Sequence, residues 1–250
     1  MLISCFKQHC AALLLAGLLA PALASTDHPS IKRPFDLPPS ADLVYSIKAS
    51  QRGITLSGDA VINWRAGGDA YSIVAETRTP LFGKILDNKS AGAVDGFGLA
   101  PAQYYEKRLF KEANTTQFSR ATKSISFSEG DKTYPIKGGE QDRASAQWQL
   151  IAVARGAPEK FTPGSEWAFF VAGRHDAERW VFKVVKRETL HTSMGDIDTL
   201  HLIKAPPPDA KGQQLDIWLA PNLDWYPVRL RFDEGDGDFV EQTLVKISKQ

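Results

Sequence analysis

Apolar and polar residues alternate along most of this chain, which is the pattern of strands with one buried face. The clearest alternating runs are residues 43–47, 54–64, 71–75, 167–171, 180–184, 226–232 and 239–247. Turn residues such as Arg52-Gly53 and Gly67-Gly68 separate neighbouring runs. Strands joined by short turns predict an antiparallel meander, because a parallel sheet would need a helix between successive strands.

The carboxy-terminal runs also predict which side chains share a face. In residues 226–232 four apolar side chains alternate with Arg229 and Arg231, which should lie on the opposite face. In the last run the residues expected on one face are Phe239, Thr243, Val245 and Ile247.

One helix is predicted between Asp142, which can cap its start, and Gly156, which with Pro158 ends it. Its apolar side contains Ala144, Trp148, Ile151 and Ala152. The apolar face of a mainly antiparallel sheet must be covered, by a helix or by the sheet itself. The predicted fold is therefore mainly β: a curved antiparallel sheet or open half-barrel with one covering α-helix.

The first 24 residues have the three parts of a signal peptide. Lys7 is basic, residues 11–20 are apolar, and Ala22-Leu23-Ala24 is a small-x-small cleavage pattern. The apolar stretch is shorter than the ~20 residues that a membrane-spanning helix needs. We expect cleavage before Ser25 and export to the periplasm of a Gram-negative-type cell.

The remaining chain is expected to form one domain. Residues 25–39 are polar and contain several prolines, which is typical of a flexible arm, and residues 40–250 read as a single β-rich domain with a proline-rich surface loop at 206–212. Both cysteines lie in the leader, so thiol chemistry and cysteine-bound zinc are excluded. Without Lys7 the chain has 29 basic and 29 acidic residues, which argues against nucleic acid as the partner. No later segment is apolar enough for an integral membrane protein.

Familiar catalytic motifs are absent: the sequence has no G-x-S-x-G, no H-E-x-x-H, no P-loop and no dinucleotide-binding fingerprint. The four histidines after the leader have no metal-ligand spacing, and His201, in a strand-like segment, is expected to be structural or exposed. The acidic run 233–238 favours a hairpin turn, with calcium as an alternative that lacks EF-hand spacing. We therefore assign no catalytic residue, metal or cofactor.

Two clusters could bind a ligand. The first is Gln141-Asp142-Arg143, together with Tyr105 and Arg108 of an earlier strand. The second is the segment 216–229, in which two strands meet at a turn. The candidate binding residues are Arg108, Arg143, Asp216, Trp218, Trp225 and Arg229.

Arginines of these clusters could hold an anionic head group through paired hydrogen bonds. The alternative is a structural network in which Asp142 caps the helix and Asp216 or Asp224 pairs with Arg229 or Arg231. In this structural alternative, Asp216 approaches Arg229 across the hairpin. Trp218 and Trp225 flank the pair.

The run Asp216-Ile217-Trp218-Leu219-Ala220-Pro221, continued by Asp224-Trp225-Tyr226-Pro227-Val228-Arg229, resembles an exported proteobacterial family known as domain of unknown function 3108. Gly98-Leu99-Ala100-Pro101 before Tyr104-Tyr105, and Gln141-Asp142 at the helix start, are also similar to it. The resemblance covers about residues 40–248. It implies export and a β-rich domain, but no activity. A curved sheet with a covering helix is also similar, at the level of the fold, to periplasmic lipoprotein carriers.

Three functions remain open. The first is a periplasmic binding or carrier module for an apolar, lipid-like ligand, which a hollow interior would favour. The second is an envelope interaction or scaffold protein without a small ligand, which a filled core would favour. The third is an unrecognised envelope hydrolase with carboxylates such as Asp142 or Asp216, which a cleft with convergent carboxylates would favour.

Overall fold

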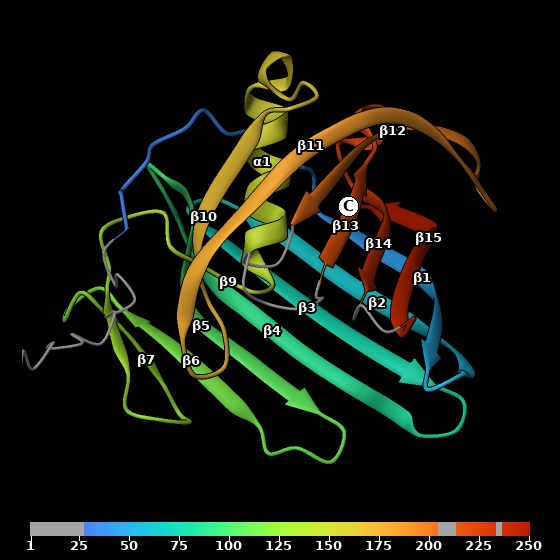
Figure 1. Ribbon diagram of the computed structural model, residues 1–250. Helices are drawn as coiled ribbons and strands as arrows, with labels where there is room; N and C mark the ends of the chain where they lie inside the picture. The colour runs from blue at the N-terminus through green and yellow to red at the C-terminus, as the bar shows by residue number, and fades with distance from the viewer. Residues whose placement is uncertain (1–27, 205–213, 234–236) are drawn as a thin grey trace, which may run out of the picture.

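The computed structural model describes residues 28–204, 214–233 and 237–250 (Figure 1). Its strands are β1 (Ala41–Gln51), β2 (Ile54–Gly67), β3 (Ala70–Thr79), β4 (Gly83–Asp95), β5 (Gly98–Arg108), β6 (Asn114–Ser119), β7 (Ser124–Phe127), β8 (Thr133–Pro135), β9 (Gln141–Asp142), β10 (Glu166–Ala172), β11 (Ala177–Thr192), β12 (Gly195–Lys204), β13 (Gln214–Leu219), β14 (Pro227–Asp233) and β15 (Phe239–Lys249). The α-helix is α1 (Ser145–Gly156), and two short 3₁₀ turns are η1 (Pro158–Lys160) and η2 (Pro221–Leu223).

All of these strands belong to one open sheet, in the order β8-β7-β6-β5-β4-β3-β2-β1-β15-β14-β13-β12-β11-β10-β9. Neighbouring strands are antiparallel except β9 and β10, which run parallel. The predicted antiparallel meander is therefore confirmed. The chain reverses direction at Arg52-Gly53, as the sequence predicts, with both residues at positive φ.

The two edge strands of the sheet are consecutive in the sequence. Only residues 136–140 separate β8 from β9, and a linker of that length spans at most roughly 20 Å. The sheet must therefore curve until its ends approach each other. Where they meet, Phe118, Ile125 and Tyr134 pack against Phe170 of β10 in a second, smaller core.

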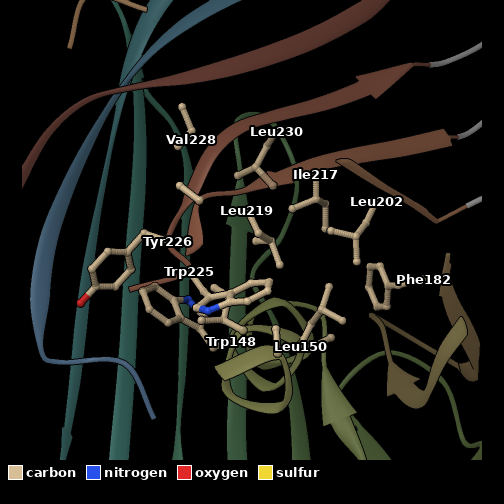
Figure 2. Packing of buried hydrophobic residues seen from close by; sticks show 14 of the residues in the cluster. Trp148, Leu150, Phe182, Leu202, Ile217, Leu219, Trp225, Tyr226, Val228 and Leu230 are labelled. Carbon is tan, nitrogen blue, oxygen red and sulfur yellow. The ribbon is translucent and has the colours of Figure 1, made fainter. Parts of the chain in front are cut away.

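Helix α1 lies inside this curve, with β2–β5 on one side and β10–β11 on the other (Figure 1). The sequence predicts one apolar side, but the structure buries almost the whole helix, including all residues from Trp148 to Ala154. A helix enclosed by a sheet needs apolar residues all round, which the run Leu150 to Ala154 supplies. Figure 2 shows Leu150, Leu219 and Trp148 directed into the same core.

Trp148 anchors the helix. Its ring stacks on Trp64 of β2 at 4.3 Å between centroids and meets the edge of Tyr226 at 6.2 Å. Trp64 is itself fixed because its indole N–H donates to the carbonyl oxygen of Pro38 at 3.0 Å. Aromatic pairs of this kind contribute about 0.5–1.5 kcal/mol beyond the area that they bury.

Asp142 orders the start of the helix, although α1 begins at Ser145, two residues later than a direct cap at Asp142 would require. Its Oδ1 accepts the backbone N–H groups of Ala144 and Ser145, each at 2.8 Å. Its Oδ2 accepts the hydroxyl of Ser90 at 2.6 Å. Burial raises the pKa of Asp142 to about 6, although these hydrogen bonds oppose the shift.

The faces of β14 are as predicted, but the face predicted for β15 is wrong in part. Val44 pairs with Lys246 and Tyr45 pairs with Leu244, so a bulge skips Val245. The extra residue shifts the alternation by one, and Leu244 becomes the fully buried side chain.

Residues 28–39 contain neither helix nor strand, but they contact the domain. The backbone N–H of Asp36 donates to the carbonyl oxygen of Ala152 at 2.9 Å, and Pro38 accepts the indole of Trp64. The expected flexibility of this arm and the division into domains stay predictions. The leader, the cut before Ser25, the loop at 206–212 and part of the acidic run lie outside the described residues.

Replacing Trp148 by alanine should lower the free energy of unfolding by about 3–5 kcal/mol, because it removes a large aromatic side chain that is only 4% exposed. Urea melts of the purified domain measure this. Val245→Ala, at a side chain 37% exposed, is the control and should cost less than about 1 kcal/mol. A loss below about 1 kcal/mol for Trp148→Ala would contradict the anchoring role.

Asp142→Asn should change how stability depends on pH. Because burial raises the pKa of Asp142 to about 6, its protonated form is favoured by folding, and the stability that this provides is lost as the pH rises from about 4 to 6. The free energy of unfolding of the variant, relative to that of the unaltered protein, should therefore rise across this window by up to about 3 kcal/mol. Above about pH 6 the difference should stay constant. Urea melts between pH 3 and 8 test this, with Asp59→Asn at an exposed position of β2 as the control. A constant difference across the window would show that Asp142 is already ionised below it.

Candidate functional site

A groove of about 340 Å³ opens on the concave side of the sheet, between the start of α1 and the strands around it. We call it the concave groove. Its apolar lining residues are Ala60, Ile62, Ile73, Ala75, Leu86, Tyr104, Ala144, Trp148, Trp180, Leu215, Leu230, Phe232 and Val240. Its other lining residues are Thr77, Asn88, Glu106, Arg108, Arg143, Gln147, Glu178, Lys204 and Gln242.

The groove follows from a mismatch in length between the helix and the strands. The 12 residues of α1 span about 18 Å, whereas the 14 residues of β2 span roughly 45 Å. The helix therefore covers the sheet at Trp64 but not at Ile62, which is two residues earlier on the same face of β2. The uncovered apolar residues form the floor of the groove.

Glu106, on β5, is the most buried carboxylate in the groove and is held by three partners. Its carboxylate lies 2.8 Å from Nε of Arg108 and 3.2 Å from Nη1 of Arg174, and accepts the hydroxyl of Tyr104 at 2.9 Å. Burial alone would raise the pKa of Glu106, but the charge of Arg108 and these hydrogen bonds outweigh it and leave that pKa below its ordinary value. Glu106 is thus an ionised, paired group.

Lys204, at the end of β12, lies on the other side of the groove. Its ammonium is 3.7 Å from Glu178 and 4.7 Å from the centre of the Trp180 ring. Burial lowers the pKa of Lys204, Glu178 opposes this, and the positive charge of Arg143 lowers it further. Two cations from separate elements therefore act on each other across the groove.

Arg143 differs from the other half-buried arginines. In the described part of the chain it makes no hydrogen bond and no ion pair, and its Nε is buried. Arg155 and Arg229 also have a buried Nε without an acceptor, but each has a carboxylate within 4.0 Å. Gly173 leaves the space that the guanidinium occupies, because a Cβ there would lie 3.0 Å from Nε of Arg143.

A second polar group of the groove is also unsatisfied. The side-chain oxygen of Asn88, on β4, is buried without a hydrogen-bond partner. Groups of this kind cost free energy unless something satisfies them. Asn88 and Arg143 are thus two groove residues that each have a buried polar atom without a hydrogen-bond partner.

Of the six binding residues proposed from the sequence, the structure brings Arg108 and Arg143 together in the groove. Trp225 lies instead in the core, where its ring meets the edge of Phe161 at 5.8 Å. Asp216, Trp218 and Arg229 point to the opposite, convex face of the sheet, because they alternate with the core residues of β13 and β14.

The predicted pairing of Asp216 with Arg229 is wrong. In the register of the sheet Asp216 lies opposite Arg231, and Arg229 lies opposite Trp218. The carboxylate of Asp216 binds Nε2 of His201 at 2.6 Å instead. The bulge between Trp218 and Leu219 sets this register, and the sequence gives no sign of it.

His201, Trp218 and Arg229 form a stack across three strands on the convex face. The His201 and Trp218 rings are 4.4 Å apart and 3° from parallel, and the Arg229 guanidinium lies 5.8 Å from the Trp218 ring. The Trp218 indole N–H donates to Glu188 at 2.9 Å. Burial would raise the pKa of Asp216, but its hydrogen bond to His201 contributes most to holding that pKa below its ordinary value. These contacts are architectural.

Sequence reasoning missed Glu106, Lys204, Trp180 and Asn88. The sequence did contain a signal for Glu106 and Lys204. Each is a charged residue at a strand position where the alternation predicts a buried side chain. Lys204 follows Leu200 and Leu202 on one face, and Glu106 follows Tyr104. An ionisable residue in that phase indicates either an internal ion pair or a cavity.

The described residues contain no group of three or more His, Cys, Asp or Glu side chains placed to hold a metal ion. Within the same residues, no helix is long and apolar enough to cross a membrane. A search of curated proteins found no match.

Solved structures give distant similarities. A Bacteroides fragilis protein described as exported, with a YmcC-like fold, is 12% identical over 88% of this chain and 100% of its own, with a TM-score of 0.35. A DUF1329 family protein from Desulfovibrio piger is 9% identical over 86% and 87%, with a TM-score of 0.30. A Vibrio parahaemolyticus domain described as that of an outer membrane lipoprotein-sorting protein is 11% identical over 85% and 86%, with a TM-score of 0.27.

A family model gives a direct assignment. Residues 44–245 match the family described as Protein of unknown function (DUF3108). This range contains the motif at 216–229, the Gly98-Leu99-Ala100-Pro101 turn and the helix start. The match spans most of the 250 residues, and the chain therefore belongs to the DUF3108 family.

Proposed function

We propose that this protein is a binding or carrier module of the cell envelope, working in the periplasm, that shelters an apolar ligand in the concave groove. One observation carries the proposal: the sheet and α1 leave a groove of about 340 Å³ with a mainly apolar lining. Pockets for small molecules are typically about 300–1,000 Å³, largely apolar, with a few polar groups that fix orientation.

The groove supports this function over the other two hypotheses. A scaffold protein needs no cavity, and leaving apolar groups such as Ile62 and Ala75 uncovered costs free energy at about 25 cal/mol per Å². A hydrolase using Asp142 and Asp216 would need the two carboxylates to converge. Asp142 is buried beneath the start of α1, whereas Asp216 lies on the convex face bound to His201.

The compartment is supported by the leader-like pattern of the first 24 residues. An apolar molecule that crosses an aqueous compartment must be kept from water, because each exposed CH₂ costs about 0.8 kcal/mol. A groove of the observed size gives such shelter to one ligand.

Filling the groove should block binding. Ala75→Trp places an indole on the floor of the groove and should weaken binding of the uncharged fluorescent dye N-phenyl-naphthylamine by about tenfold or more, a change of about 1.4 kcal/mol. Dye fluorescence titrations measure the affinity, and thermal melts check that the variant is folded.

The matched control is Val61→Trp, which adds the same side chain on neighbouring β2 at an outward position that is 38% exposed. Its dye affinity should stay within about twofold of the unaltered protein. Equal affinities for both variants, or no dye binding by the unaltered protein, would contradict the proposed function.

A further inference from the structure

We propose that the ligand of the concave groove is a single-chain amphiphile with an anionic head, a carboxylate or a phosphate monoester, and that Arg143 and Lys204 hold this head. The inference rests on the proposed function and adds the chemical class of the ligand.

Among the residues that line the groove, cations outnumber carboxylates. Its lining carries three cations, Arg108, Arg143 and Lys204, against two carboxylates, Glu106 and Glu178. Arg108 is paired with Glu106, and Lys204 lies 3.7 Å from Glu178, which is half exposed. Arg143 is therefore the cation left over, and an anion is the complementary occupant.

The position of Arg143 favours a bound anion over contact with water. Its Nε is buried and lacks an acceptor, and Gly173 supplies the space for its guanidinium. A buried donor without an acceptor costs about 1–3 kcal/mol, more for a charged group. A carboxylate or phosphate oxygen satisfies such a donor, and the planar guanidinium can bind it through two parallel hydrogen bonds.

Lys204 would act on the same head from across the groove. Arg143 and Lys204 both line the groove, and burial and the positive charge of Arg143 lower the pKa of Lys204. An anion between them would offset both effects. Besides Arg143 and Lys204, the charged side chains that line the groove are Glu178 on β11, and Glu106 and Arg108 on β5.

Most apolar residues of the groove come from elements that contribute no ionisable side chain to it. β2 and β3 contribute Ala60, Ile62, Ile73, Ala75 and Thr77, and no ionisable side chain. β13, β14 and β15 likewise contribute no ionisable side chain to the groove. The cations come from the end of β5, from the segment before α1 and from the end of β12. This division suits a molecule with one apolar and one charged part.

The volume limits the apolar part to one chain. At about 340 Å³ the groove lies at the lower end of the range for small-molecule pockets, about 300–1,000 Å³. A lipid with two chains of ordinary length would leave one of them outside.

The test is displacement of N-phenyl-naphthylamine by four compounds at about pH 8, where carboxylates are ionised. The compounds are dodecanoate, dodecyl phosphate, dodecanol and inorganic phosphate. Dodecanoate and dodecyl phosphate should displace the dye at concentrations about tenfold lower than dodecanol, which corresponds to about 1.4 kcal/mol. Inorganic phosphate alone should not displace it, because it lacks the chain.

Arg143→Met keeps an unbranched apolar stem but removes the guanidinium and its charge, and should abolish the tenfold preference while dodecanol still binds. Arg229→Met, on the convex face, is the matched control and should keep the preference. If Arg143→Met does not fold, as judged by circular dichroism, Lys204→Met serves as the test and should reduce the preference at least threefold, in keeping with a single charged contact.

Equal displacement by dodecanoate and dodecanol would overturn the inference but leave the proposed function intact. A preference that survives both Arg143→Met and Lys204→Met would also overturn it. Displacement by inorganic phosphate as effective as that by dodecyl phosphate would show a site for the free anion instead of an amphiphile. If none of the chain compounds displaces the dye, the proposed function itself fails.

Discussion

The stacking of Trp148 on Trp64 holds the helix inside the sheet, and the rest of the structure depends on it. A fifteen-stranded single layer has a concave apolar face far larger than a 12-residue helix can cover. Where α1 lies, its buried residues and the sheet form the main core. Past the amino-terminal end of α1, no helix of the described residues covers the concave face of the sheet. The concave groove is the result. The position of this one aromatic contact therefore decides where the domain is solid and where it is hollow.

The sequence was sufficient for the architecture, because strands and helices leave periodic signals. Alternation along residues 43–47 and 226–232 predicts the strands and their faces, and the spacing of Ala144, Trp148, Ile151 and Ala152 predicts the helix. It was also sufficient for the family, since the motif at 216–229 falls within the matched residues 44–245. Of the residues that line the groove, the sequence proposes Arg108 and Arg143, because arginines bind anions through paired hydrogen bonds.

The remaining features of the site depend on the strand register and on how far the sheet curves. Neither leaves a local signal in the sequence. A bulge after Trp218 places Arg231, not Arg229, opposite Asp216, and a bulge at Val245 moves Leu244 into the core. Lys204 and Glu106 lie on strands that are far apart in the sheet. They line the same groove only because the sheet curves. The motif at 216–229, rich in Asp, Trp and Arg, predicts a ligand site, whereas in the structure its polar side chains point outward, and Trp218 and Arg229 stack with His201.

The most direct test of the central claim, that the uncovered part of the sheet shelters an apolar molecule, is native mass spectrometry of the protein isolated from the cells that make it, before and after solvent extraction. The account predicts one added mass per chain, of the size of a single-chain anionic amphiphile, that extraction removes and recovers as that compound. A mass equal to the bare polypeptide in gentle conditions, unchanged by extraction, would contradict the claim and mean that the groove is only a gap in the packing.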